Sequence, residues 1–102
     1  MSEETQGLAE VYTFAKPFIF EGQDTKEVTL DFGNLSGNDI ISCDRQYRAE
    51  QRGGISLAPE MDKAYLAYVV AKAAGVHVEL IRTAKAKDFT ALTLRARNFL
   101  LL

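Results

Sequence analysis

Residues 59–75, PEMDKAYLAYVVAKAAG, decide how the rest of the chain folds, because they form its longest run of helix-forming and apolar residues. Pro59 suits the first turn of a helix, where its missing N–H would have no partner in any case. Gly75 stands where helices commonly end in the left-handed conformation. We therefore predict a helix over residues 59–75 at the centre of the molecule.

This predicted helix is apolar on more than one side. Tyr65, Tyr68 and Val69 share one face, and alanines fill much of the remainder. A helix of this kind needs neighbours on several sides. Two interpretations stay open: a central helix buried within one chain, or a helix shared between the core and a contact with a second copy. The stretch is too short and too interrupted by charge to cross a membrane, which takes about 20 apolar residues.

The bulk composition indicates one small domain. The chain has 102 residues, 47% of them hydrophobic, and a net charge of −2. This mildly acidic balance does not favour binding to nucleic acid or to anionic membranes. The single cysteine, Cys43, excludes an intramolecular disulfide and fits a reducing cytoplasm. Residues 1–10 are polar and acidic, unlike a signal peptide, and we expect a flexible arm there and a single domain over residues 11–102.

Two strands are predicted ahead of the helices. Phe18 and Phe20 alternate with Ile19, and residues 28–32, VTLDF, alternate in the same way. This period of two is typical of strands with one face on a core. The polar segment 21–24, EGQD, separates the two runs and predicts an antiparallel hairpin. A lone hairpin is marginal in water, so it must pack on the helices or pair with another chain.

Three further helical segments are expected around the central helix. Ser36 can cap a helix that continues to about residue 51, with Asp39 in the third helical position as a short-armed capping box. In that helix Cys43 lies on the apolar face, which favours a core residue over a reactive thiol. Residues 76–81 suggest a short helix or turn. A last helix is predicted to begin near Asp88, whose negative charge complements the helix dipole. The fold class predicted is α+β: an N-terminal antiparallel hairpin followed by about four helices.

The sequence offers no recognisable catalytic, cofactor or metal site. The only histidine, His77, has no cysteine or second histidine near it in sequence, so a zinc site is not expected. A nucleophile and base pair of Cys43 with His77 has no local support. Gly53-Gly54 lacks the lysine and serine or threonine of a phosphate-binding loop. We therefore predict a protein that is not an enzyme and binds no cofactor.

The order of these segments resembles the phage tail assembly chaperone family of long-tailed phages and prophages. The resemblance is carried by residues 16–47, KPFIFEGQDTKEVTLDFGNLSGNDIISCDRQY, then by YLAYVVAKAAGV at 65–76 and KDFTALTLRARNFLL at 87–101. It implies a cytoplasmic, self-associating protein that binds the long tape measure protein, brings tail tube subunits to it, and is absent from the finished virion. Such proteins have no catalytic motif, so the resemblance assigns no active residue.

Apolar surface is what a chaperone of this kind must present to a client protein. We expect it on the central helix and at the end of the last helix, and we name as candidate protein-binding residues Tyr65, Tyr68, Val69, Phe99, Leu100, Leu101 and Leu102. Phe99 continues the apolar stripe of the last helix, whereas Leu101 and Leu102 lie beyond it. Two other roles stay open: a tail or head–tail component retained in the virion, and a small regulatory protein-binding module.

Overall fold

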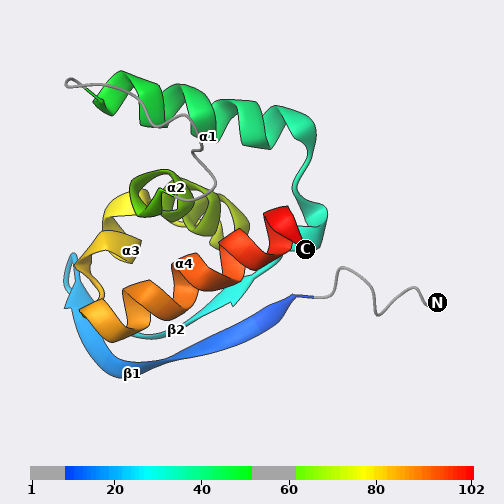
Figure 1. The fold of residues 1–102 in the computed structure, drawn as a ribbon. Helices are drawn as coiled ribbons and strands as arrows, with labels where there is room; N and C mark the ends of the chain where they lie inside the picture. The colour runs from blue at the N-terminus through cyan, green and yellow to red at the C-terminus, as the bar shows by residue number, and fades with distance from the viewer. Residues whose placement is uncertain (1–8, 52–61) are drawn as a thin grey trace.

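The computed structural model describes residues 9–51 and 62–102 and shows a β-hairpin followed by helices (Figure 1). The elements are β1 (Glu10–Phe20), β2 (Gln23–Leu30), a 3-10 turn η1 (Phe32–Asn34), α1 (Gly37–Glu50), α2 (Lys63–Ala74), α3 (Val78–Thr83) and α4 (Ala86–Leu101). This arrangement confirms the predicted α+β class, with an antiparallel hairpin ahead of four α-helices. None of the helices in the described part of the chain has the length and apolar character needed to cross a membrane.

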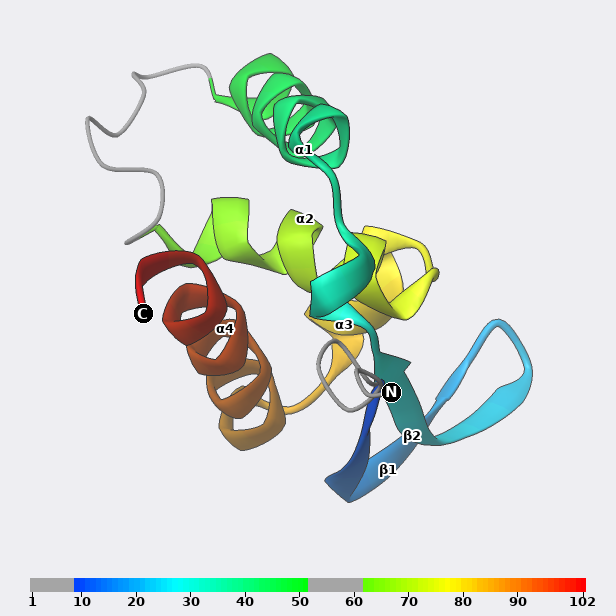
Figure 2. The same cartoon turned by 90° about the vertical axis from the view of Figure 1, so that its right-hand side faces the viewer.

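The hairpin turns tightly at Glu21 and Gly22. Both residues have positive φ, 50° and 80° respectively, as in the mirror-image turns that match the twist of two paired strands. The predicted alternation is confirmed in β1, where Phe18 and Phe20 are half-buried and Ile19 is exposed. Figure 2 shows the turn end of the hairpin standing away from the helices.

The strand boundaries differ from the predicted ones. Glu10 belongs to β1 rather than to the arm predicted over residues 1–10, and its carboxylate pairs with Arg95 at 2.9 Å. Residues 1–8 of that arm lie outside the described residues. At the other end β2 stops at Leu30, and Phe32 opens η1 instead of continuing the strand. The chain leaves the sheet here because the N–H of Asp31 donates to the carbonyl of Ala73, at the end of α2.

An irregularity in β1 fixes the hairpin to α4. The pairing register jumps between Thr13 and Phe18, and in this bulge the N–H groups of Ala15 and Lys16 turn toward α4. They donate to the carboxylate of Asp88, at 2.8 and 3.1 Å. The hydroxyl of Tyr12 donates to the same carboxylate at 2.6 Å. Asp88 was predicted to complement the dipole of the last helix; it also holds the bulged strand.

Asp88 is fully buried, so its charge depends on these three donors. Desolvation alone would raise the pKa of Asp88, but the hydrogen bonds from Tyr12, Ala15 and Lys16 outweigh it and lower this pKa. Burial and the adjacent Asp88 raise the pKa of Tyr12 to about 12. The guanidinium of Arg95 lies 4.9 Å above the Tyr12 ring and adds a cation–π contact to the same group.

Local sequence signals set the helix ends. The Ser36 hydroxyl accepts from the Asp39 N–H at 3.2 Å, and the Asp39 carboxylate accepts from the Ser36 N–H at 2.8 Å, which confirms the predicted capping box. Gly75 ends α2 with φ of 68°, as predicted. The start of α2 is corrected from Pro59 to Lys63, because the Asp62 carboxylate caps the helix by accepting from the Ala64 N–H at 2.8 Å. Pro59 itself lies outside the described residues.

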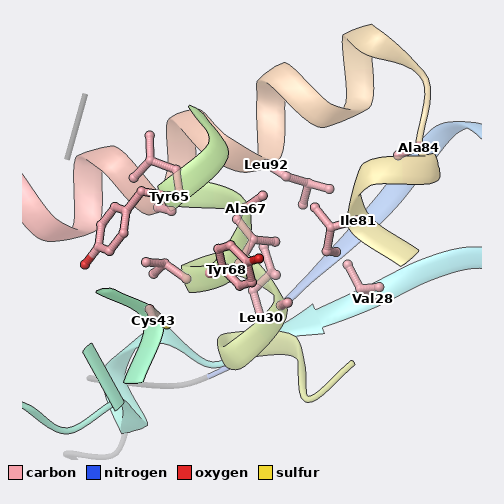
Figure 3. Packing of buried hydrophobic residues seen from close by; sticks show 14 of the residues in the cluster. Val28, Leu30, Cys43, Tyr65, Ala67, Tyr68, Ile81, Ala84 and Leu92 are labelled. Carbon is pink, nitrogen blue, oxygen red and sulfur yellow. The ribbon is translucent and has the colours of Figure 1, made fainter. Parts of the chain in front are cut away.

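Helix α2 occupies the centre of the core. It contacts α1, α3, α4 and β2, and Figure 1 shows it between α1 and α4. Figure 3 shows Leu92 of α4, Ile81 of α3 and Leu30 of β2 gathered around it. Cys43 of α1 is also buried in this cluster, which confirms its predicted place as a core residue. One chain therefore supplies neighbours on all sides of its most apolar helix.

Candidate protein-binding site

The candidate residues on α2 lie in the core. Tyr65, Tyr68 and Val69 are at most 8% exposed, so none of them presents a free apolar surface. The ring of Tyr65 packs edge-on against Tyr47 of α1, with 5.8 Å between ring centroids. Of the two interpretations of the central helix, the structure shows burial within one chain. The surplus apolar surface expected on this helix, from which self-association was predicted, is therefore not present.

Tyr68 takes part in a polar link between helices. The Arg82 guanidinium of α3 lies 5.2 Å above its ring and forms an ion pair with Glu50 of α1 at 2.6 Å and a second with Glu79 at 3.1 Å. The hydrogen bond from Arg82 lowers the pKa of Glu50, and the hydrogen bond to Glu50 helps to raise the pKa of Arg82. Burial raises the pKa of Tyr68, and its hydrogen bond with Glu50 adds to this rise. This arrangement joins α1 to α3, and Tyr68 contributes to it from α2.

The candidate residues at the end of α4 lie at the surface. Phe99 is 45% exposed, Leu101 50% and Leu102 97%, while Leu100 is partly buried against the core. One face of Phe99 stacks on Phe32 of η1, with 5.4 Å between centroids. We call Phe99, Leu101 and Leu102 the α4-end patch.

The structure thus divides the seven predicted residues into two groups. Those on α2 hold the core together, and those at the end of α4 form a surface that includes three large apolar side chains within four consecutive positions. Exposed apolar residues that are scattered singly need no explanation, but several at one end of a helix provide apolar area for a contact with another molecule. The sequence did not reveal that Phe32 supports this patch, because the apolar alternation placed it in a strand.

A second surface feature lies where the turn end of the hairpin faces α3. This groove has a volume of about 510 Å³ and combines apolar with acidic lining residues. The apolar ones are Phe20, Val28, Val76 and Leu80, and the acidic ones are Glu21, Asp24 and Glu27. Its walls come from segments about 50 residues apart in sequence, so the sequence alone did not predict this groove.

A polar hollow of about 370 Å³ lies between the end of α2 and the start of α1. Its lining includes Asp31, Asp39 and Lys72, and one carboxylate oxygen of Asp31 is buried without a hydrogen-bond partner among the described residues. Hydrogen bonding from the Ser36 N–H lowers the pKa of Asp39, whose charge serves the capping box. This hollow has no apolar surface comparable to the α4-end patch.

Cys43 and His77, the side chains considered for catalysis, have structural roles. Burial raises the pKa of the Cys43 thiol to about 11, which keeps it protonated and weakly nucleophilic. Nδ1 of His77 accepts from the Glu79 N–H at 3.0 Å and caps α3. Across residues 9–51 and 62–102, no group of three or more histidine, cysteine, aspartate or glutamate side chains is placed to hold a metal ion.

Comparisons of the chain with protein-family models, with curated proteins and with solved structures gave no match.

Proposed function

We propose that this chain is a tail assembly chaperone of a long-tailed phage or prophage. It acts without catalysis, binds the tape measure protein and the tail tube protein during tail assembly, and associates with further copies of itself. It works in the cytoplasm of the bacterial host and is absent from the mature virion. The proposal rests on the order of segments that resembles this family, over residues 16–47, 65–76 and 87–101.

The observation that carries the proposal is the α4-end patch. The core of this small chain is closed around α2, yet Phe99, Leu101 and Leu102 remain at the surface beside Phe32. A client that is long, helical and apolar in stripes needs such a surface to cover it. The buried tyrosines of α2 are therefore left out of the proposed contact, which we assign to the end of α4.

Co-expression with the tape measure protein of the same phage tests this assignment. The variant Leu101→Ser/Leu102→Ser removes apolar surface that the core does not use, so its melting temperature should stay close to that of the native chain. The soluble fraction of the tape measure protein should fall several-fold. Ile41→Ser/Leu94→Ser is the matched control, since both residues are exposed on other helical faces, at 53% and 47%.

The result that counts against the assignment is full solubilisation by the patch variant. Equal losses with the patch variant and the control would mean that general surface apolarity, rather than the end of α4, retains the client. Sedimentation of the same proteins reports self-association separately. If oligomer size falls only in the patch variant, the patch contacts another copy as well.

A further inference from the structure

We propose that the groove between the turn end of the hairpin and α3 binds a lysine- or arginine-bearing apolar segment of the client protein. This inference rests on the proposed function for the identity of the client, but not for the chemistry of the site. The turn end of the hairpin and the C-terminal end of α4 lie on opposite sides of the molecule in Figure 2. The groove and the α4-end patch are therefore separate surfaces that can be tested one at a time.

Negative charge is concentrated in this groove. Its lining includes the carboxylates of Glu21, Asp24 and Glu27 and no lysine or arginine, which gives a formal charge of −3 in a chain whose net charge is −2. None of the three has an ion-pair partner among the described residues. Lys26, the nearest basic residue in sequence, does not line the groove; it borders a neighbouring hollow beside Ile19, which Asp24 also lines. A complementary occupant must therefore bring the positive charge itself.

The carboxylates are spread out rather than gathered at one point. In the described parts of the chain no three acidic, histidine or cysteine side chains converge closely enough for a metal ion. Charges at separate places along a groove suit a partner with several separate cations. Lysine and arginine side chains on a peptide meet that requirement, whereas nucleic acid, with its phosphates, would be repelled.

The apolar lining supplies the other half of the recognition. Phe20, Val76 and Leu80 are partly buried and border the groove from the hairpin, from the connection between α2 and α3, and from α3. At about 510 Å³ the groove falls in the range of roughly 300–1,000 Å³ typical of sites that enclose a ligand of several side chains. An occupant with apolar side chains flanked by basic ones would satisfy both the lining and the charge.

Binding of a short fluorescein-labelled peptide of alternating leucine and lysine, followed by anisotropy, tests the proposal on the intact protein. A peptide with glutamate in place of lysine is the charge control. We expect the leucine–lysine peptide to bind at least tenfold more tightly, with an affinity that falls as salt is added, because exposed charges are screened. Glu21→Gln/Asp24→Asn/Glu27→Gln should weaken binding by about tenfold, since each exposed ion pair contributes only a few-fold.

Single variants distinguish a local effect of the groove on peptide affinity from a general effect of net charge. Asp24→Asn in the groove should weaken binding a few-fold, whereas Asp44→Asn on α1 makes the same charge change and should leave it unchanged; Asp44 pairs only with its helix neighbour Arg48. Leu80→Ser tests the apolar wall and should also weaken binding. Thermal melting of each variant confirms that it is folded.

Three results would overturn the proposal. These are no binding of the leucine–lysine peptide up to about 1 mM, equal binding of the leucine–glutamate peptide, and native affinity in the triple variant. A different result would count against the proposed function. It is an equal soluble fraction of the tape measure protein with the α4-end patch variant and with its control. Peptide binding that persists in Leu101→Ser/Leu102→Ser would show that the groove acts independently of the patch.

Discussion

Asp88 is a single residue that joins two distant parts of the chain. Its buried carboxylate accepts from Tyr12, Ala15 and Lys16, which lie more than 70 positions earlier in the sequence. Ala15 and Lys16 belong to the bulge of β1, so the carboxylate replaces the partners that the strand loses where its register breaks, whereas Tyr12 lies in the paired part of the strand. Hydrogen bonds to a charged acceptor are stronger than neutral ones, and Asp88 therefore stabilises the bulge.

We predict that Asp88→Ala lowers the free energy of unfolding by about 3 kcal/mol, because it removes the charged acceptor of three hydrogen bonds, from Tyr12, Ala15 and Lys16. Tyr12→Phe removes one donor and leaves both backbone bonds, so it should cost about 1 kcal/mol. Chemical denaturation at neutral pH measures both variants. A smaller loss for Asp88→Ala than for Tyr12→Phe would contradict this account of the bulge.

The contributions of Asp88 and Tyr12 to the free energy of unfolding depend on pH. Since the native pKa of Asp88 is lowered, its contribution to stability is present above the unfolded value of about 3.9 and is lost as pH falls through the native value. The stability gap between the native chain and Asp88→Asn should therefore narrow in acid. Tyr12 behaves in the opposite sense: its native pKa of about 12 is raised, so its contribution is present below about 10 and lost as pH rises through 12. A gap that widens in acid would show that the carboxylate is not charged in the fold.

Among the secondary elements, the hairpin contains the least favourable local conformation. Glu21 adopts φ of 50° in the first position of the turn, where asparagine followed by glycine is preferred. We predict that Glu21→Asn raises the free energy of unfolding by about 0.5 kcal/mol, because asparagine tolerates the left-handed region better. Thermal or chemical unfolding measures the change. Gly22→Ala, which puts a side chain at φ of 80°, is the opposing control and should destabilise the hairpin.

The elements that sequence predicted well are those defined by local signals. Ser36 and Asp39 form a capping box across three positions, and Gly75 ends α2 by its own conformation. The predicted start of α2 was wrong, because Asp62 caps the helix and Lys63 is its first residue. Helix α3 was expected only as a helix or turn, since it is six residues long and capped by His77.

Long-range contacts were beyond prediction from one sequence. The dipole argument for Asp88 was local, whereas its buried donors come from the opposite end of the chain. The apolar faces of Tyr65 and Tyr68 suggested a surface, but α1 covers Tyr65 and Arg82 covers Tyr68. Leu101 and Leu102 are exposed, as expected for residues beyond the apolar stripe of α4, whereas Leu100 is partly buried and Phe99, which was placed on that stripe, is 45% exposed.

At the scale of the whole molecule, the core is closed and the two candidate contact surfaces are separate. One is the α4-end patch beside η1, and the other is the acidic groove beside the turn of the hairpin; Figure 2 shows the end of α4 and that turn on opposite sides. A chain with two separate surfaces can bind one long client at two places, and linked contacts strengthen each other. This arrangement is compatible with a chaperone that covers an extended protein.

The measurement that tests the central claim most directly is the amount of this chain bound to the tape measure protein before and after the tail is built. Tape measure protein is isolated from cells blocked before tube polymerisation and from finished, purified tails, and this chain is quantified in both by mass spectrometry. Our account predicts that the chain is abundant in the first sample and absent from the second. A fixed number of copies in finished tails would identify a virion component, and absence from both samples would contradict the chaperone role.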